Sequence, residues 1–235
     1  MSGKFHKNMI SYKEKIKCLL SRLAGFPLAI KAEIMAFRMA KKMRRADDYR
    51  SYLKDQISTS LRKNSNSGLN NRTVYLAEKL NRFLPESRPG KIILCVGCRN
   101  RFELDEIERV CACKASGLDL FSVDPRIHAG DMHAMPFEDS SFDAVYSCHS
   151  LEHSHDYAVV LKEFVRVVKP GGLLVIEIPV VFTPSASDRW DAGSVDNLLR
   201  ILQDFVQQVL FKEETERAAQ GILKKDARLI IRIKK

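Results

Sequence analysis

The sequence predicts an α/β fold in which a doubly wound, mostly parallel sheet is covered by helices on both faces. Short apolar runs of strand length alternate with helical patterns over residues 73–235. An apolar run ends at Val96, a turn follows at Gly97, and a helix-start pattern begins at Asn100. These residues therefore predict a strand, a turn and a helix in succession. Asp119 follows Gly97 by 22 residues, near the spacing at which such sheets present a carboxylate to a ribose.

Apolar spacing, interrupted by glycines and prolines, predicts the first elements. Thr73–Leu84 has apolar side chains at helical spacing, and Pro85–Gly90 ends that helix. Lys91–Val96 is predicted to be a buried central strand, with Ala115–Leu120 as the second strand and Ile127–Ala129 as a short third. The interval between the second and third strands is too short for a full crossover helix, so we expect a reduced helix or a plain loop there.

The middle of the domain continues the alternation. Phe142–Ser147 is predicted as the fourth strand and Tyr157–Val168 as the helix that follows it. Lys169–Gly172 is expected to stop the helix and turn the chain into the buried strand Leu173–Ile178. A polar loop, Phe182–Gly193, comes next.

Two further strands close the pattern. Ser194 can cap a helix that runs to about Gln203, and Val206–Phe211 and Ala227–Lys234 are the closing strands. In sheets of this kind, ligands bind beyond the carboxyl ends of the strands. The residues expected at those ends are Gly97, Asp119, Asp131 and Cys148–His153.

The composition is that of a folded protein. A chain of 235 residues with 45% hydrophobic content suffices for one sizeable α/β domain plus an extension. No apolar run approaches the ~20 residues that span a bilayer. The longest N-terminal run, Leu23–Ile30, lies too far from the start for a signal peptide, so we expect a cytoplasmic protein.

The six cysteines include one C-x-x-C pair, Cys95 and Cys98. No second pair of cysteines or histidines follows at the spacing of a zinc site, and Cys95 lies inside an apolar strand. We therefore expect free thiols and assign no metal.

The positive charge is concentrated in the N-terminal part of the chain. Residues 1–89 carry a net charge of +13 and residues 90–235 a net charge of −3. We expect a basic helical extension over residues 1–72, with a linker rich in serine and asparagine at Ser58–Asn71, and one domain over residues 73–235. Two interpretations of the extension, residues 1–70, stay open: its helices lie on an anionic membrane surface or a nucleic-acid backbone, or they pack their apolar side on the domain.

Four blocks in order give the chain a resemblance to the class I S-adenosylmethionine-dependent methyltransferases. They are VGCRN, GLDLFS, GDMHAMPFEDSSFDAVY and LKEFVRVVKPGGLLVIEIP, and the resemblance covers about Thr73 to Lys235. It implies a Rossmann-like, seven-stranded sheet whose last strand is inserted antiparallel. The long turn expected over Glu213–Asp226 is consistent with that insertion.

The resemblance also implies a role for individual residues. The Gly97 turn would approach the methionine part of S-adenosylmethionine, and Asp119 would hold the ribose hydroxyls. Asp131 and Met132 would line the adenine. Cys148 and His149 would close over the cofactor through backbone contacts. The full set implied for the cofactor is Gly97, Cys98, Arg99, Asp119, Leu120, Asp131, Met132, Cys148 and His149.

The chain departs from the family pattern at the glycine turn. Cys95 stands where the family usually has an acid, and Arg99 and Arg101 stand where it usually has glycines. Arg99 either pairs with the cofactor carboxylate or blocks the cofactor by its bulk. We favour binding, because Asp119 and Asp131 would otherwise have no use.

The catalytic candidates follow the fourth strand. His149 and His153 stand, with Glu152 between them, on the side where an acceptor would meet the methyl group. A histidine there could take a proton from an attacking hydroxyl. The alternative is that Glu152 and His153 only cap or pin the next helix.

These features predict a methyltransferase that moves a methyl group from S-adenosylmethionine to an oxygen, or with less support a nitrogen, of an unidentified acceptor. No motif of nucleic-acid base methylation occurs, so small-molecule, sugar or lipid-linked acceptors come first. The rival from another class is a non-catalytic adaptor that binds a membrane, an RNA or a protein through its basic helices. An RNA methyltransferase whose extension contacts phosphates is the third hypothesis.

Overall fold

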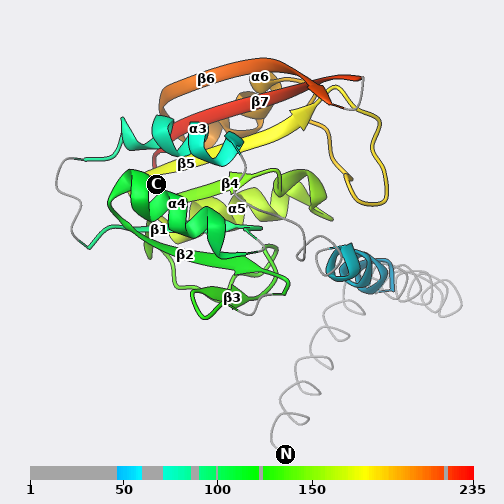
Figure 1. Cartoon of the computed structure of the whole chain (residues 1–235), viewed down its shortest axis with the longest axis horizontal. Helices are drawn as coiled ribbons and strands as arrows, with labels where there is room; N and C mark the ends of the chain where they lie inside the picture. Colours follow the sequence, from blue (N-terminus) through cyan, green and yellow to red (C-terminus); the bar gives the residue numbers. More distant parts are fainter. Residues whose placement is uncertain (1–46, 60–70, 86–89, 99, 122–123, 220–221) are drawn as a thin grey trace, which may run out of the picture. The chain divides into compact units, whose positions relative to one another are not determined.

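The computed structural model describes residues 47–59, 71–85, 90–98, 100–121, 124–219 and 222–235 (Figure 1). By their internal contacts, Met1–Ser51 and Tyr52–Lys235 form two compact units. Residues 47–59 are helical. The predictions for most of the basic extension and for Arg99 fall outside the described residues. In the part of the chain described, no helix is long and apolar enough to cross a membrane.

Seven strands form one sheet in the order β3-β2-β1-β4-β5-β7-β6. β7 pairs antiparallel with both β5 and β6, and the pairings among β1 to β5 are parallel. The predicted fold class and the antiparallel insertion of the last strand are confirmed. The strands are β1 (Ile92–Val96), β2 (Lys114–Asp119), β3 (Ile127–Ala129), β4 (Phe142–Cys148), β5 (Val168–Val180), β6 (Val206–Ala219) and β7 (Ile222–Ile233).

Helices cover both faces of this sheet (Figure 1). Buried residues of α3 and α4 share one hydrophobic cluster with the strands, and those of α5 and α6 share another. The bounds of these helices are α3 (Asn71–Asn81), α4 (Arg101–Cys111), α5 (Tyr157–Val167) and α6 (Val195–Leu202), with 3₁₀ turns η1 (Leu151–His153) and η2 (Gln203–Phe205).

The central strand β1 shows why both faces are covered. Ile93 and Cys95 belong to the cluster under α3 and α4, whereas Leu94 and Val96 belong to the cluster under α5 and α6. Side chains of a strand alternate between its faces, so a run that is apolar at every position has to be buried twice. All four side chains are at most 1% exposed.

Three of these helices, α4, α5 and α6, each begin after a polar capping residue. Asn100 accepts a hydrogen bond from the Phe102 N–H at 3.2 Å at the start of α4. Ser194 accepts one from the Asn197 N–H at 3.1 Å at the start of α6. Asp156 caps α5 in the same way.

The predicted turn at Lys169–Gly172 is wrong in form, because these residues bulge out of β5. The pairing of β4 with β5 jumps from Phe142 opposite Val168 to Ala144 opposite Leu173. Gly171 adopts a φ of 71°, which glycine reaches without strain, and its carbonyl accepts a hydrogen bond from Arg232 Nη1 at 2.8 Å. The helix still ends here, as predicted.

The predicted long turn over Glu213–Asp226 is also wrong, because β6 and β7 continue pairing as a hairpin through that interval. Opposite charges face each other across it. Glu213 meets Arg228 at 2.9 Å, and Glu216 meets Lys225 at 3.3 Å. A polar sequence therefore extends the strands, where its polarity had suggested a turn.

The predicted linker Ser58–Asn71 is shorter than expected at both ends. Ser58 and Thr59 belong to the helix at residues 47–59, and Asn71 begins α3. The residues between them lie outside the described part of the chain. The interval between β2 and β3 contains no helix among its described residues, as expected.

Candidate functional site

A cavity opens at the carboxyl ends of β1 and β2, next to the point where the strand order reverses between β1 and β4. In α/β sheets this is the position at which ligands bind. The cavity is lined by Tyr52, Gln56, Val96, Gly97, Leu118, Asp119, Leu120, Gly130, Met132, Ser150 and His153. Of the residues predicted for the site, it brings together Gly97, Asp119, Leu120, Met132 and His153.

Gly97 brings the backbone close to the turn after β4. Its φ is 74°, and a Cβ atom added there would lie 2.3 Å from the Cβ of Ser150. Ser150 is held in place by its hydroxyl, which donates to the Val96 carbonyl at 2.8 Å and lies 2.7 Å from the Ser147 hydroxyl. Only glycine therefore fits this position on both counts, conformation and space.

Asp119 places a carboxylate at the end of β2, 9% exposed. Its Oδ1 atom accepts a hydrogen bond from the Phe121 N–H at 3.3 Å. Its backbone carbonyl accepts one from Gly130 at 2.8 Å, which ties the end of β2 to the loop after β3. Apolar side chains of Leu118 and Leu120 flank it on the cavity wall.

Asp131 is held by His133, two residues further on. Its Oδ1 atom accepts the His133 backbone N–H at 2.9 Å and lies 2.7 Å from His133 Nδ1. The other ring nitrogen, Nε2, accepts the backbone N–H groups of His155 and Asp156, both at 3.1 Å. Because a backbone N–H can only donate, the ring proton is on Nδ1 and points to Asp131. The carboxylate does not line the cavity itself, although its neighbour Met132 does.

Tyr52 and Gln56 line the cavity but were not among the residues expected from the sequence. They lie four residues apart on one side of the helix at residues 47–59, and both are buried. The Tyr52 ring meets the ring of His133 edge-on, with centroids 5.8 Å apart. Burial, together with the charge of Asp131, raises the pKa of the Tyr52 phenol, so the hydroxyl stays protonated.

His153 is the only predicted catalytic residue that lines the cavity. Its Nδ1 atom lies 2.9 Å from the Ser187 carbonyl oxygen and 3.0 Å from Asp188 Oδ1. Burial alone would lower the pKa of His153, but the hydrogen bond to Asp188 and the negative charges of Glu152 and Asp188 outweigh it and raise the pKa.

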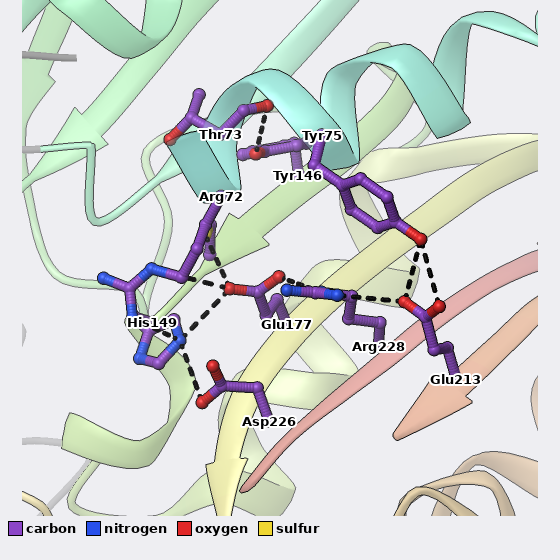
Figure 2. Close-up of polar contacts among 10 residues, drawn as sticks. Arg72, Thr73, Tyr75, Tyr146, His149, Glu177, Glu213, Asp226 and Arg228 are labelled. Atoms are coloured by element: carbon purple, nitrogen blue, oxygen red, sulfur yellow. Dashed lines mark hydrogen bonds and ion pairs between the residues drawn. The ribbon is translucent and has the colours of Figure 1, made fainter. Parts of the chain in front are cut away.

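His149 lies at the same strand end but outside the cavity lining. Figure 2 shows its ring among charged side chains that come from several elements. Nδ1 lies 3.3 Å from Glu152, and Nε2 lies 3.1 Å from Glu177 and 3.5 Å from Asp226. Arg72 also approaches Nε2, at 2.9 Å. Both ring nitrogens are therefore engaged, which leaves neither for an acceptor.

The carboxylates around His149 set its charge. Burial lowers the pKa of His149 and Arg72 works in the same direction, but Glu152 and Glu177 outweigh both and raise it. Burial would raise the pKa of Glu177, yet the hydrogen bonds and charges of His149 and Arg228 lower it to about 2. The cluster is thus a set of buried ion pairs, in which each group is kept charged by its oppositely charged neighbours.

One group among the described residues has the geometry of a cation site. The ligating atoms of His149, Glu177 and Asp226 lie within 4.8 Å of one another. Arg228 already pairs with Glu177, and Arg72 lies 3.8 Å from it, so two guanidinium groups supply the positive charge that a cation would bring. We assign no metal to this cluster.

The other described residues predicted for the cofactor contribute no lining side chain. Cys98 is 6% exposed, and its sulfur packs toward Gly117 of β2. The Cys148 sulfur lies 3.7 Å from Glu177. The five described cysteines are free thiols, as expected. Arg99 lies outside the described residues, so its effect on binding stays a prediction.

The loop between β5 and α6 fixes the surroundings of His153. The backbone N–H groups of Arg189 and Trp190 donate to the Glu152 carbonyl at 2.8 and 3.2 Å. Trp190 stacks on Tyr157 with ring centroids 4.2 Å apart. Gln56 Nε2 donates to the Ser187 carbonyl at 3.2 Å, so the loop is tied to the cavity wall as well.

Comparison with known proteins adds a family to this geometry. A family described as a methyltransferase domain matches residues 94–176, which run from within β1 into β5 and include most of the cavity lining. The chain is 45% identical over 51 residues to sterol 4-C-methyltransferase strm-1 of Caenorhabditis elegans, covering 22% of the chain and 15% of that protein.

Two more relatives match in the same limited way. A 2-methyl-6-phytyl-1,4-hydroquinone methyltransferase of Synechocystis sp. is 43% identical over 63 residues, covering 27% of the chain and 20% of that protein. A demethylmenaquinone methyltransferase of Staphylococcus aureus is 52% identical over 46 residues, covering 20% of the chain and 19% of that protein. The aligned part thus spans a fifth or less of the length of these curated relatives.

Solved structures share the fold over much more of the chain. A Burkholderia thailandensis 1,6-didemethyltoxoflavin-N1-methyltransferase with bound S-adenosylhomocysteine superposes with a TM-score of 0.58 at 15% identity, covering 80% of this chain and 90% of that one. A geranyl diphosphate methyltransferase in complex with S-adenosylmethionine gives 0.52 at 16% identity, over 68% and 84%. The [4+2]-cyclase SpnF gives 0.54 at 18% identity, over 72% and 83%.

Proposed function

We propose that the chain is a class I S-adenosylmethionine-dependent methyltransferase, whose cavity binds S-adenosylmethionine and which methylates an acceptor. One observation carries the proposal: the buried carboxylate of Asp119 stands at the end of β2, in a cavity that Gly97 also lines. The fold alone would not carry it, because a protein of the same fold is named as a cyclase.

The lining residues fit the proposed cofactor. A carboxylate such as Asp119 can accept hydrogen bonds from both hydroxyls of a ribose. Leu118, Leu120 and Met132 offer an apolar surface to an adenine ring. The glycine at position 97 lets the backbone approach the methionine part of the cofactor. The roles of Asp131 at the adenine amine and of Arg99 at the cofactor carboxylate remain predictions.

When bound, S-adenosylmethionine supplies a methyl group that is activated for transfer by its positive sulfur. The protein's own task is to hold the acceptor in line with that methyl group and to keep water out. We propose oxygen as the first choice of acceptor atom, because His153 is available at the cavity to take a proton, and nitrogen as the second. The relatives are named for a sterol, a phytyl hydroquinone and demethylmenaquinone, which supports a small or lipid-linked acceptor.

Calorimetry with S-adenosylmethionine and S-adenosylhomocysteine tests the binding site. Asp119→Ala removes the acceptor of two hydroxyl hydrogen bonds, so we expect the affinity to fall by roughly 10- to 100-fold. Asp204→Ala, at an exposed position, is the control and should bind normally. The proposal fails if the full chain shows no binding at high micromolar concentration, or if Asp119→Ala binds as tightly as the control.

The acceptor can be found by incubating the full chain with cell extract and cofactor labelled in its methyl group. A labelled product that appears only with active protein identifies the acceptor, and Asp119→Ala should reduce its yield. Cofactor binding without any labelled product would favour the adaptor hypothesis. A labelled RNA would favour the RNA methyltransferase hypothesis.

A further inference from the structure

We infer that His153 is the general base that takes the proton from the acceptor, and that Asp188 and the Ser187 carbonyl hold its ring in the protonation state required for that step. The inference rests on the proposed methyl transfer and extends it to the chemical class of the acceptor. It is carried by the position of His153, by the partners of its Nδ1 atom and by the network that fixes the loop around it.

Position is the first requirement of a base. His153 lines the same cavity as Gly97 and Asp119, at the end of the 3₁₀ turn η1 that follows β4. Its side chain is 23% exposed, so it is accessible from the cavity but largely removed from bulk water. A base has to reach the attacking atom of the acceptor, and this histidine is the one on the cavity wall.

The second requirement is a nitrogen with a free lone pair. The Ser187 carbonyl oxygen can only accept a hydrogen bond, so its 2.9 Å contact with Nδ1 requires a proton on that nitrogen. A neutral ring with its proton on Nδ1 carries the lone pair on Nε2. None of the residues that the structure describes forms a hydrogen bond with His153 Nε2.

The third requirement is stabilisation of the ring once it has taken the proton. Asp188 Oδ1 lies 3.0 Å from Nδ1, on the side of the ring opposite to the one that would receive the proton. The carboxylate orients the ring and balances the positive charge that develops on it, as in other pairs of a base and an orienting acid. Glu152, which is buried, adds a second negative charge nearby.

The loop that carries Asp188 is itself held in place. Asp188 and Ser185 form two hydrogen bonds, Ser185 N–H to the Asp188 carbonyl at 2.8 Å and Asp188 N–H to the Ser185 hydroxyl at 3.0 Å. The next two residues donate to the Glu152 carbonyl, next to His153 in sequence. The orienting carboxylate therefore keeps a fixed position relative to the ring.

Methyl transfer to an acceptor oxygen breaks two bonds and forms two. The acceptor O–H bond breaks, its proton goes to His153 Nε2, and the oxygen lone pair forms the new bond to the methyl carbon of S-adenosylmethionine. The carbon–sulfur bond breaks and its electron pair stays on sulfur. The products are a methyl ether, S-adenosylhomocysteine and a protonated His153, which returns the proton to water. The acceptor class is thus a molecule whose attacking atom carries a proton, with an alcohol or phenol preferred.

His149 differs from His153 in its surroundings. It lies in the same CHSLEH segment, yet both of its nitrogens face charged partners, and it does not line the cavity. We therefore assign the base to His153 and a structural role to His149.

The protonation pattern of His153 can be measured in the full-length protein without cofactor or acceptor. Nitrogen NMR of the imidazole rings, with the His153 signals identified by their loss in His153→Gln, should show a proton on Nδ1 and none on Nε2 above the pKa. Asp188→Ala should lower that pKa, because the hydrogen bond and the charge that raise it are removed, whereas the exposed control Asp204→Ala should leave it unchanged. A ring protonated on Nε2, or a pKa that does not respond to Asp188, would overturn the inference.

Kinetics with the acceptor found in the labelled extract provide the second readout. His153→Gln should lower kcat by roughly 10²- to 10⁴-fold and leave calorimetric cofactor affinity nearly unchanged. The exposed His128→Gln on β3 is the matched control and should keep full activity. If His153→Gln retains kcat, the base assignment is wrong.

The pH profile separates positioning from mere structural support. A protonated His153 cannot accept a proton, so kcat should fall as the pH falls through its pKa. Asp188→Asn should lower kcat with little change in KM and move this limb to lower pH. The titratable groups around the ring are Asp188 and Glu152 beside it, and Asp119 and Tyr52 on the cavity wall. A limb that stays in place would overturn the role of Asp188.

The outcomes also separate this inference from the proposed function. A product methylated on an atom with no proton to lose, such as a thioether sulfur, would overturn the base and leave methyl transfer intact. Absence of cofactor binding would instead remove the proposed function and the role of His153 with it.

Discussion

At the scale of single residues, two glycines with similar backbone conformations have very different surroundings. Gly97 has a φ of 74° and Gly90 a φ of 83°. A Cβ atom at position 97 would collide with Ser150, whereas one at position 90 would meet no atom of the described residues within 4 Å. The pair therefore separates the cost of the conformation from the cost of the space.

We expect Gly97→Ala to lower the free energy of unfolding by about 3 kcal/mol or more, because backbone strain and overpacking against Ser150 add together. Gly90→Ala should cost about 1 kcal/mol, from backbone strain alone. Urea denaturation measures both, and calorimetry should show cofactor binding lost only in Gly97→Ala. Equal costs for the two variants would contradict this account of the turn.

The cavity residues that could be predicted from the sequence are those whose position is indicated by the residues next to them in the chain. Gly97 and Asp119 follow strands of their own, so the strand pattern places both at one edge of the sheet. Tyr52 and Gln56 could not be assigned in this way, because an amphipathic pattern does not say which surface the helix covers. Asp188 comes from an irregular loop, whose contacts depend on tertiary packing.

At the scale of elements, the register of three strands creates a row of charges. Arg228 on β7 stands opposite Glu177 on β5 and opposite Glu213 on β6. Tyr75 of α3 donates its hydroxyl hydrogen to Glu213 at 3.0 Å (Figure 2). The row joins three strands and a helix with Arg228 in its middle, and the carboxylate of Glu177 at the β5 end is fully buried.

This row makes stability depend on pH. The pKa of Glu177 is about 2 in the folded protein against 4.5 unfolded, so its contribution is complete above pH 4.5 and is lost as the pH falls through 2. The shift corresponds to about 3 kcal/mol. Between pH 6 and pH 2, the unfolding free energy of the wild type should fall by about that amount more than the unfolding free energy of Glu177→Gln. The exposed Glu138→Gln is the control and should behave as wild type; a Glu177→Gln slope equal to it would contradict the assignment.

Strands could be predicted from the sequence where their burial requires a run of apolar residues. β1, β2, β3 and β4 are apolar or short and glycine-bounded, and the predicted positions agree with the structure. Where β6 and β7 continue through Glu213–Asp226, charged side chains pair across the strands, Glu213 with Arg228 and Glu216 with Lys225. A polar strand of this kind resembles a loop in sequence, which explains the error over Glu213–Asp226.

At the scale of the whole molecule, charge and chemistry lie in different parts of the chain. Residues 1–46 hold 12 lysines and arginines against 2 acidic residues, whereas residues 47–235 hold 27 of each. Among the described residues, the cavity lining begins at Tyr52. Removal of residues 1–70 would therefore delete cavity residues together with the basic segment, so a truncation at residue 46 is the more informative variant.

We expect the chain that begins at residue 47 to bind S-adenosylmethionine with an affinity close to that of the full chain. Tyr52→Ala in the full chain should weaken binding by roughly tenfold, because a buried wall of the cavity is lost. Calorimetry compares the two, and sedimentation with anionic phospholipid vesicles at rising salt reports on the basic segment. Weak cofactor binding by the truncated chain would show that the basic segment also supports the site.

One carbonyl oxygen, that of Ser187, receives hydrogen bonds from both Gln56 and His153. A single atom thus couples a helix near the start of the described chain to the imidazole on the cavity wall. If the loop that bears this oxygen moved, Gln56 would lose the acceptor of its hydrogen bond, and His153 Nδ1 would lose a hydrogen-bond acceptor as well. The orientation of the His153 ring therefore depends on a loop that the helix at residues 47–59 also holds through Gln56.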